Sequence, residues 1–442
     1  MLTRIEIDGF KSFDRFRVDL PPFLVVLGQN ASGKSNLFDA IQLLSRLATA
    51  PRVKEVFNDQ RGDLLEQFRR RGDGTFLGMM SFAVELTLEP SVVDSFGEHA
   101  EINHTRVRYE LRVVLTKDDE YVSPMVLQEV AYPIGPGHTE VARDSGGMST
   151  GEVPSPLLKT LVRDGTPTFA LYREGEEPRL IRADSAMSTV LSSITSARDF
   201  PHLLAIRREL ESWRFLRLDP VALRMPSRIG LSDEQLEPTG ANLAAVLHRI
   251  QRATRDEFGS GLDEIAVDLA QVIQGFSGVE VKENKAAGQW EIELTTGDEG
   301  KVSARVASDG TLRVLALLAA LYDPEHRGLL CFEEPENGIF PQRLRKLMHV
   351  LKELTAEPGP GEPLTQVILT SHSPLMLAVL EPEDIVVMDW VSRVSPGAPT
   401  SRVSRVRVLA DQAGSGLEPM SRFEQRELLA ITEDEARRLL EG

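Results

Sequence analysis

The chain has a single cysteine, Cys331, among its 442 residues. One cysteine cannot form an internal disulfide, and its position within an apolar run indicates a buried thiol. The sequence also lacks any run of about eighteen apolar residues, the length needed for a membrane-spanning helix. Its first residues, Met1 to Ile7, alternate like a strand and do not resemble a signal peptide. These absences favour a cytoplasmic protein that works without a membrane.

Positive charge is also scarce, because 50 Lys and Arg stand against 67 Asp and Glu, for a net charge of −17. This balance argues against a surface wholly devoted to nucleic acid, although it leaves room for a local basic patch. One such cluster, beside Phe68, is formed by Arg69, Arg70 and Arg71, and a second runs from Trp213 to Arg217. Arg69, Arg70 and Arg71 are candidate contacts to a nucleic-acid backbone, and the alternative is a solvated or ion-paired arginine cluster.

Neither an internal repeat nor a heptad pattern sustained over about three heptads is present, so a long coiled-coil arm is not expected. Strand patterns dominate from Ser81 to Tyr132, and mainly helical or irregular structure is expected from Leu157 to Arg228. Strands and helices follow one another again after Val279. The length allows two or three domains, or one large α/β domain with insertions.

The most informative segment follows the short apolar run Phe23–Leu27, which predicts a buried strand. It matches G-x-x-x-x-G-K-[ST], the phosphate-binding loop of P-loop NTPases, and reads Gly28-Gln29-Asn30-Ala31-Ser32-Gly33-Lys34-Ser35. A helical pattern then begins at Asn36. This order places backbone N–H groups and the positive end of a helix dipole around phosphates. Lys34 would reach the β- and γ-phosphates, and the Ser35 hydroxyl would bind Mg²⁺.

A second segment supplies paired acids. The apolar run Leu329–Phe332 ends in Glu333 and Glu334, and Glu336 follows after a proline. In open α/β sheets, ligands bind beyond the carboxyl ends of the strands. Glu333 would therefore hold the Mg²⁺ shell, while Glu334 would orient and deprotonate the attacking water. The alternative is a pair of solvated acids that cap the next helix.

Two further elements fit the same site. The tetrapeptide from Ser308 to Thr311 precedes an apolar helical pattern, so it would either cap that helix or form an anion site at its N-terminus. His372 follows the strand-like run Gln366–Leu369 and is expected next to the acidic strand in a parallel sheet. It is either a structural histidine or a hydrogen-bond donor to a γ-phosphate oxygen.

The P-loop, Ser-Asp-Gly-Thr, Glu-Glu-Pro-Glu-Asn and Thr-Ser-His-Ser-Pro, in this order, resemble the ABC-type ATPase heads of the SMC, RecF and OLD group. The segment Gly9–Phe13 is similar to that group's opening F-[KR]-S-F. The resemblance covers residues 1–48 and 300–390 well and the middle loosely. It implies an α/β fold of the ABC-type P-loop ATPase head, with a β-rich first lobe, a mainly parallel central sheet, and a helical/β insertion between the P-loop and Ser308. It also implies a division into a first lobe (1–134), a mainly helical insertion (135–278) and a second lobe (279–442).

The resemblance implies a role for each matching residue. ATP and Mg²⁺ would be the cofactors of an ATPase that converts ATP and water to ADP and phosphate. The Walker A loop and its surroundings would bind ATP through Lys11, Gly28, Gln29, Asn30, Ala31, Ser32, Gly33, Lys34, Ser35 and Asn36. Glu333 would be the Walker B acid, Glu334 the catalytic base and His372 the switch histidine, acting together with Lys34. Ser35 and Glu333 would hold the metal. Since this position is usually aspartate, Glu333 departs from the pattern by one methylene, and its contact to Mg²⁺ can run through water.

The resemblance also implies a second copy of the chain. Ser308, Asp309 and Gly310 would form the signature motif, which contacts the γ-phosphate of a nucleotide held by the other subunit. Asn337 would begin the D-loop between subunits. The protein would then be a homodimer, or a higher homo-oligomer, with ATP sandwiched between its heads. A glutamine loop is expected at Gln60, Gln67 or Gln128.

Several kinds of ATPase share these motifs. A transporter subunit is disfavoured because Ser308 lies unusually far after the P-loop and no membrane segment is present. A RecF-like DNA-repair ATPase or clamp remains open, as does an ATPase of bacterial antiviral defence that works with a separate effector. About seventy residues follow His372 and contain no spaced acidic cluster, so a nuclease would be another chain. A slowly hydrolysing, nucleotide-dependent scaffold is the non-enzymatic alternative, and the presence of Glu334 speaks against it.

Overall fold

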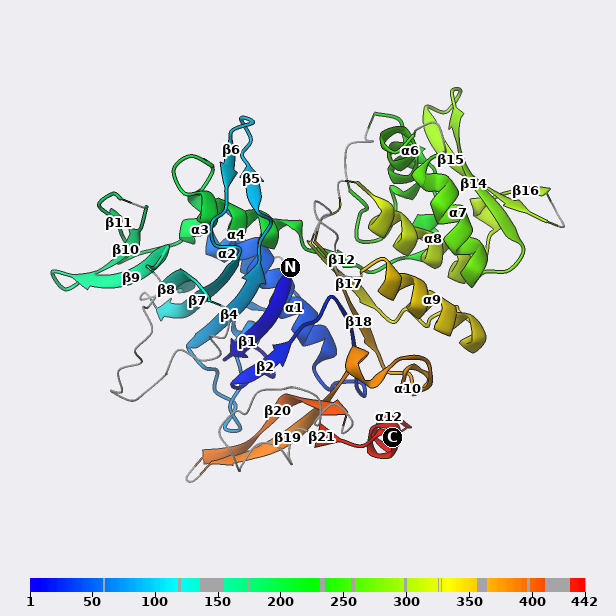
Figure 1. Cartoon of the computed structure of the whole chain (residues 1–442). Coiled ribbons are helices and arrows are strands. Elements are labelled where there is room, and N and C mark those ends of the chain that lie inside the picture. The colour runs from blue at the N-terminus through cyan, green and yellow to red at the C-terminus, as the bar shows by residue number, and fades with distance from the viewer. Residues whose placement is uncertain are drawn as a thin grey trace. The chain divides into compact units, whose positions relative to one another are not determined.

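The structure is a computed structural model (Figure 1). It describes residues 1–58, 60–117, 121–135, 155–173, 175–230, 235–255, 259–297, 300–324, 326, 328–355, 364–395, 398–409 and 430–441. The chain forms two compact units, each assembled from separate stretches. The first unit comprises Met1–Leu20, Ala31–Trp213 and Met388–Val406, and the second unit comprises Pro21–Asn30, Arg214–Val387 and Arg407–Gly442. The division into segments 1–134, 135–278 and 279–442 stays a prediction about sequence organisation.

An eight-stranded antiparallel sheet forms the framework of the first unit. In spatial order its strands are β11 (Arg179–Arg182), β10 (Thr166–Leu171), β9 (Leu158–Arg163), β8 (Val122–Pro133), β7 (Arg106–Lys117), β4 (Met79–Thr87), β1 (Leu2–Asp8) and β2 (Phe16–Asp19). Leu2, Ile5 and Ile7 of β1 are buried, while Arg4 and Glu6 point to the other face. This alternation is typical of an antiparallel sheet with one solvated side.

Strands β9, β10 and β11 correct one expectation. Mainly helical or irregular structure was expected from Leu157 to Arg228, but these three strands extend the sheet beyond β8. They are only four to six residues long, so their own pattern is weak, and pairing with a neighbouring strand decides their conformation.

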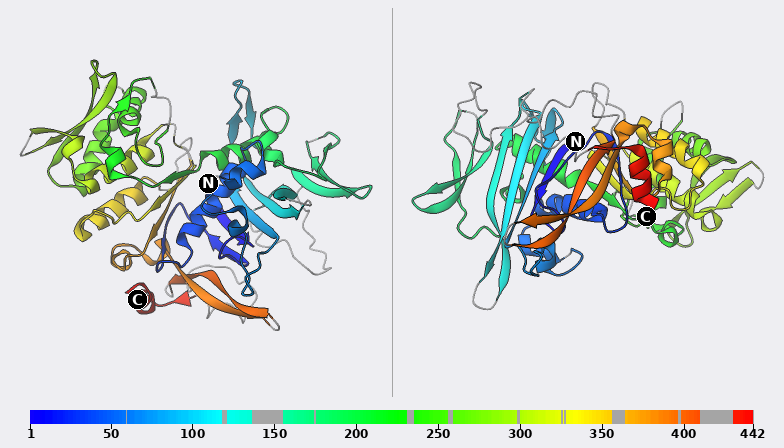
Figure 2. Two further views of the ribbon diagram at one scale, coloured as in Figure 1. Left: turned by 180° about the vertical axis from the view of Figure 1, so that it is seen from behind. Right: turned by 90° about the horizontal axis from the view of Figure 1, so that it is seen from below.

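Helices cover the apolar face of this sheet (Figure 2). They are α1 (Lys34–Leu47), α2 (Val53–Asn58), α3 (Val190–Ser193) and α4 (Pro201–Ser212), with the 3-10 turn Leu64–Gln67. Leu37, Ile41 and Leu44 of α1 are buried at helical spacing. A small ribbon is formed by β5 (Ser91–Val93) and β6 (His99–Glu101).

The second unit is built on a mainly parallel sheet. The spatial order of the whole sheet is β12 (Arg214–Leu216), β17 (Gly328–Glu333), β18 (Thr365–Ser371), β3 (Phe23–Leu27), β19 (Ile385–Ser395), β20 (Ala398–Leu409) and β21 (Ala430–Ile431), and β19 and β20 run on into the first unit's segment Met388–Val406. From β12 to β19 every neighbouring pair is parallel. All five residues of β3 are buried, as expected for a strand covered on both faces.

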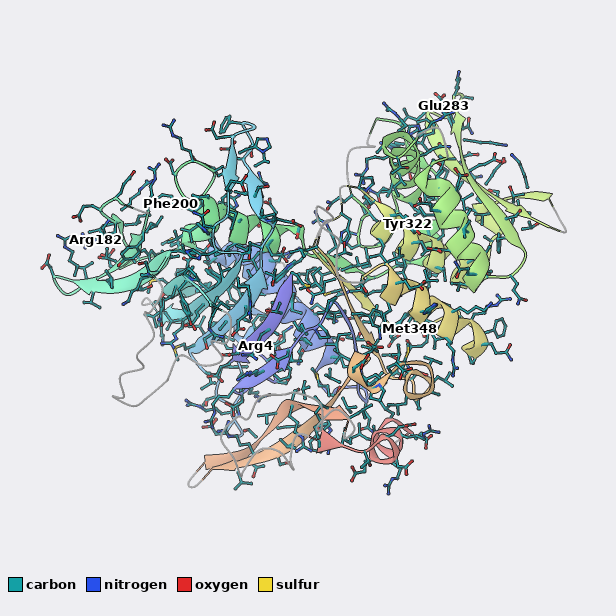
Figure 3. All side chains as sticks on the ribbon, in the orientation of Figure 1. Arg4, Arg182, Phe200, Glu283, Tyr322 and Met348 are labelled. Atoms are coloured by element: carbon teal, nitrogen blue, oxygen red, sulfur yellow. The ribbon has the colours of Figure 1, made fainter. Side chains whose placement is uncertain are left out.

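Helices and a smaller sheet complete the second unit. The helices are α5 (Pro220–Leu223), α6 (Leu243–Ala253), α7 (Gly261–Val272), α8 (Asp309–Tyr322), α9 (Pro341–Glu353), α10 (Leu375–Val379) and α12 (Glu433–Glu441), and the smaller sheet contains β13 (Ser227–Arg228), β15 (Gln289–Thr296), β14 (Phe276–Asn284) and β16 (Gly300–Ser303). Helix α7 packs on α8, α9 and β14, and the hydroxyl of Tyr322 (labelled in Figure 3) donates to Asp268 on α7 at 2.7 Å.

The predicted fold class is confirmed: a β-rich lobe, a mainly parallel sheet, and helices and strands between the P-loop and Ser308. Within the described part of the chain, no helix is long and apolar enough to cross a membrane.

Candidate nucleotide-binding and hydrolysis site

The ends of three neighbouring strands of the second unit lie beside Gly28, the predicted acids and His372. Leu27, the last residue of β3, pairs with Ser371 on β18, and Thr370 pairs with Glu333 on β17. The N–H of Gly28 donates to the Ser371 carbonyl at 3.2 Å, which ties the start of the P-loop to the end of β18. Because these strands are parallel, the first P-loop residue, the acids and His372 all follow carboxyl ends at one edge of the sheet.

The rest of the P-loop lies in the first unit and leads directly into α1. Ala31 has a φ of 63° and Gly33 a φ of 109°, so the backbone turns through the left-handed region twice. Gly33 is the N-cap of α1, and no side chain caps this helix. Lys34 and Ser35 occupy its first turn. The N–H groups of an N-terminal turn without a side-chain cap are suited to binding phosphate oxygens.

Two serines that sequence reasoning missed hold this loop. The Ser404 hydroxyl donates to the Ser32 carbonyl at 2.7 Å, and its oxygen lies 2.8 Å from the Ser12 hydroxyl oxygen, from which it can accept. Asn36 in turn donates from Nδ2 to the Ser12 hydroxyl at 2.9 Å. A Cβ at Gly33 would lie 2.3 Å from the Ser404 hydroxyl oxygen, so this close approach requires glycine. Ser12 belongs to the Phe-Lys-Ser-Phe motif and was therefore visible in the sequence, whereas Ser404 had no local signal.

Lys11 points at α1. Its Nζ donates to Asp39 Oδ2 at 2.7 Å, and the other oxygen of Asp39 accepts from Arg61 at 2.8 Å. The Asp39 side chain is 4% exposed, so both cations neutralise a buried carboxylate. Lys11 has a φ of 44°, an uncommon conformation for a residue with a side chain. Its contact with ATP phosphates stays a prediction.

Glu334 is held by two polar side chains. Its Oε1 lies 3.2 Å from His372 Nδ1, and its Oε2 accepts from Asn337 Nδ2 at 2.6 Å. The backbone of Glu334 has a φ of 54°, and its N–H donates to the Thr370 carbonyl at 2.8 Å. Left-handed backbone at a non-glycine residue costs about 1–3 kcal/mol and is concentrated at functional sites. The structure thus joins the predicted base, switch histidine and D-loop asparagine.

Glu333 offers an oxygen that suits a divalent cation. Its Oε1 is buried and has no hydrogen-bond partner, and the same is true of Oε2 of Glu336, whose other oxygen accepts from the Ser371 hydroxyl. Mg²⁺ prefers such oxygens and commonly uses one or two carboxylates plus substrate phosphates. The described residues contain no cluster of three or more His, Cys, Asp or Glu side chains that could cage a metal alone. Free carboxylate oxygens of this kind fit a metal that arrives with a nucleotide, and the roles of Glu333 and Ser35 as its ligands stay predictions.

The predicted signature motif begins α8. The Ser308 hydroxyl caps the helix by accepting from the Thr311 N–H at 3.2 Å, so the capping alternative is realised. Arg224, which sequence reasoning missed, donates to Asp309 at 2.6 Å and to the Ala307 carbonyl at 2.8 Å. A Cβ on Gly310 would lie 2.1 Å from the Gly338 carbonyl oxygen, so the signature turn and the D-loop are in direct contact.

The three candidate nucleic-acid arginines differ from one another. The Arg69 side chain is 11% exposed, pairs with Asp14 at 3.1 Å and donates to Ser401 at 2.8 Å. Arg70 lies over the Phe76 ring and is exposed, as is Arg71. The ion-paired alternative therefore describes Arg69, and nucleic-acid binding through Arg70 and Arg71 stays a prediction.

Among the candidate glutamines, Gln67 lies against the Lys11 turn. Its carbonyl accepts from the Lys11 N–H at 3.0 Å, and its fully buried side chain donates to the Arg61 carbonyl at 2.6 Å. Gln60 is also buried, and Gln128 lies on β8.

The strand–loop–helix at Gly28 and the acids that follow β17 define a P-loop ATPase head of the ABC type. A family model described as "AAA domain, putative AbiEii toxin, Type IV TA system" matches residues 23–378, and the chain belongs to this family. The match spans both the P-loop and His372. A comparison with curated proteins found no significant match.

Several solved SMC heads are similar over nearly the whole chain. An SMC head bound to the C-winged helix domain of ScpA is 12% identical, with 91% of this chain and 98% of that chain covered and a TM-score of 0.49. The SMC head domain from Thermotoga maritima is 13% identical, covers 92% and 98%, and has a TM-score of 0.40. An SMC head with coiled coil and joint from Pyrococcus yayanosii is 12% identical, covers 100% and 99%, and has a TM-score of 0.47. At these TM-scores the likenesses carry no functional argument.

Proposed function

We propose that this protein binds ATP with Mg²⁺ and hydrolyses it to ADP and phosphate, and that two copies close around ATP. In this cycle the heads regulate or drive a separate effector protein in bacterial antiviral defence. The observation that carries the proposal is the arrangement at Glu334, whose two oxygens contact His372 and Asn337. One carboxylate is thereby connected to the predicted phosphate sensor and to the predicted subunit interface.

The residues divide the work of phosphoryl transfer. The N–H groups of the P-loop and the Lys34 ammonium would bind the phosphates, while Glu333 and Ser35 would hold Mg²⁺, which neutralises charge on the β- and γ-phosphates. Glu334 would accept a proton from the attacking water. Its contacts with His372 and Asn337 take one acceptor position on each oxygen. Because a carboxylate offers about four acceptor positions, these contacts would orient Glu334 and leave it able to accept the proton.

The surface around Ser308 supports a second copy of the chain as the partner. Exposed apolar side chains surround it in the second unit: Val306 is 76% exposed, Phe340 70%, Val221 64% and Met225 56%. Exposed apolar groups gathered near one motif are typical of an interaction site. Hydrogen bonds to charged phosphates are worth about 1.5–3 kcal/mol each, so ATP could join two heads that associate weakly without it.

The family description names a putative toxin of a type IV toxin–antitoxin system, which supports a toxin-like role, and the separate effector is our own addition. The alternative is a RecF-like DNA clamp, which would use Arg70 and Arg71. Arg69 is ion-paired and nearly buried, so this alternative would rest on Arg70 and Arg71.

The test is the mass of Glu334→Gln in solution by light scattering, with and without Mg²⁺ and ATP. We expect ATP to double the mass of Glu334→Gln, because binding is kept and hydrolysis is blocked. Lys34→Ala is the matched control and should stay at the lower mass. An unchanged mass of Glu334→Gln with ATP would refute the sandwich, and absence of ATP turnover by the unmodified chain would leave the slow scaffold in its place.

The effector is sought with the same pair of variants. Affinity purification of Glu334→Gln in ATP, followed by mass spectrometry, should recover a protein that Lys34→Ala does not recover. Nuclease treatment before elution separates a direct protein partner from one held through DNA. Recovery of nucleic acid alone would favour the RecF-like alternative.

A further inference from the structure

A cavity of about 380 Å³ in the first unit borders the P-loop. Its near wall is formed by Ala31 of the P-loop and Asn36 of α1, together with Lys11 and Ser12. The other lining residues include Glu66, Arg70, Phe76, Trp390 and Arg402. The volume lies within the range of about 300–1,000 Å³ found for small-molecule sites. One side of the cavity is therefore the predicted phosphate-binding loop, and the other side comes from β19, β20 and the segment around Phe76.

The far wall presents flat, stackable groups. The Arg402 guanidinium on β20 lies 3.4 Å from the centre of the Trp390 ring on β19. Trp390 is nevertheless 42% exposed, so part of the indole surface stays accessible. Arg70 lies 6.0 Å from the Phe76 ring centre. Aromatic rings and guanidinium planes are the surfaces on which nucleobases stack.

The charge of the lining suits a phosphorylated ligand. Arg70 and Arg402 are cations, Lys11 is already paired with Asp39, and Glu66 is the one carboxylate among the lining residues. Glu66 accepts through Oε2 from the Asp63 N–H at 2.9 Å, which restrains its carboxylate. The cavity thus combines a cationic lining with stacking surfaces beside a phosphate-binding loop.

We propose that this cavity holds the purine nucleoside of the nucleotide whose phosphates the P-loop binds, with the base stacked on the Trp390–Arg402 pair. The inference rests on the proposed ATP binding and adds the residues that select a purine nucleotide over a bare polyphosphate. Trp390 and Arg402 reach this site from the far end of the chain, outside the family match at residues 23–378. Base recognition would therefore be supplied by a part of the chain that lies beyond the shared ATPase core.

The experiment compares two ligands on the full chain by calorimetry: the non-hydrolysable ATP analogue AMP-PNP and inorganic tripolyphosphate, each with Mg²⁺. Removing an aromatic stacking partner weakens binding of a base by about 5- to 150-fold. We expect Trp390→Leu to lose affinity for AMP-PNP within this range and to keep its affinity for tripolyphosphate. Trp390→Phe should regain part of the loss because a ring is restored. Phe96→Leu removes another exposed aromatic of the first unit and is the matched control.

The possible results separate the inference from the proposed function. If the unmodified chain binds tripolyphosphate and AMP-PNP equally well, the base subsite is wrong while nucleotide binding by the P-loop stands. Equal losses for both ligands in Trp390→Leu would assign Trp390 to folding of the loop and would also overturn the subsite. Failure of the unmodified chain to bind either ligand would refute the proposed function and the inference with it. Quenching of tryptophan fluorescence by AMP-PNP, but not by tripolyphosphate, in the Trp290→Phe background would support the stacking.

Discussion

The two units of this protein are built on different kinds of sheet and carry different parts of the proposed ATPase site. The antiparallel sheet of the first unit has a wet face covered by a charge network, in which Arg108 binds Glu6, Glu85 and Glu110 at 2.7–3.1 Å. The parallel sheet of the second unit is buried along its strands and concentrates its acids beyond their carboxyl ends. The first unit therefore holds Lys34 and the base cavity, and the second unit holds Glu334.

This difference leads us to expect that ATP binding and ATP hydrolysis can be impaired separately by mutation. A solvated antiparallel face can carry charges anywhere along its strands, because water reaches them. A buried parallel sheet can present polar groups only where its strands end. The residues proposed for hydrolysis lie at one sheet edge for that reason, and mutations in the two units should change different kinetic quantities.

The largest expected effect tests this separation. Glu334→Gln should lower ATP turnover by about 100- to 10,000-fold, the usual contribution of a general base, and leave ATP binding intact. Lys34→Ala should abolish binding itself, because it removes the ammonium proposed to contact the β- and γ-phosphates. Steady-state phosphate release and equilibrium binding of AMP-PNP measure the two quantities.

Glu353→Gln makes the same chemical change as Glu334→Gln on an exposed side chain of α9, and it should leave both quantities unchanged. If Glu334→Gln and Lys34→Ala lose ATP binding to the same extent, binding and hydrolysis are not assigned to different units.

The same comparison shows what the sequence could predict. The strand Phe23–Leu27, the P-loop and the acids after β17 are encoded by short continuous patterns, and all three were predicted from them. The Ser404–Ser32 contact joins residues 372 positions apart, and no local pattern announces it. Strands β9–β11 were missed because pairing with neighbouring strands, from β8 outward, makes them strands. Motifs of consecutive residues were therefore predictable, and contacts between residues far apart in the sequence were not.

The two units should also respond oppositely to pH. Glu129 on β8 is fully buried and accepts from Tyr109 at 2.9 Å and from the N–H groups of Val190 and Leu191 at 2.6 and 3.1 Å. Burial outweighs these donors and raises the pKa of Glu129 from 4.5 to about 7. A raised folded-state pKa gives stability that is complete below pH 4.5 and is lost as pH rises through 7. The shift corresponds to about 3 kcal/mol. Urea unfolding in the Trp290→Phe background, which leaves Trp213 and Trp390 as reporters of the first unit, should show this loss, and Glu129→Gln should remove it.

The burial of His326 predicts that the stability of the second unit changes with pH in the reverse direction, falling as the pH falls. Its burial, with a smaller effect of Arg214, lowers its pKa from 6.5 to about 4. A lowered folded-state pKa gives stability that is complete above pH 6.5 and is lost as pH falls through 4. Amide exchange of a β17 peptide, corrected for the intrinsic pH dependence, should speed up on acidification and should do so less in His326→Gln. Parallel pH profiles for the two units would contradict this assignment.

The smallest expected effect concerns the contact between the signature turn and the D-loop. Alanine in place of glycine inside a helix normally stabilises it by about 1 kcal/mol. At Gly310, however, the new Cβ would meet the Gly338 carbonyl, a backbone group that cannot turn aside, so overpacking should cost about 1–3 kcal/mol instead. At Gly297 of the same unit a Cβ meets open space, and Gly297→Ala serves as the control. Thermal unfolding should therefore rank Gly310→Ala below the unmodified chain and Gly297→Ala close to it. Because Gly310 touches the D-loop that also carries Asn337, Gly310→Ala should weaken ATP-dependent dimerisation more than it weakens ATP binding. An unshifted melting temperature would mean that the D-loop yields easily, and the signature turn would then not be rigidly coupled to Glu334.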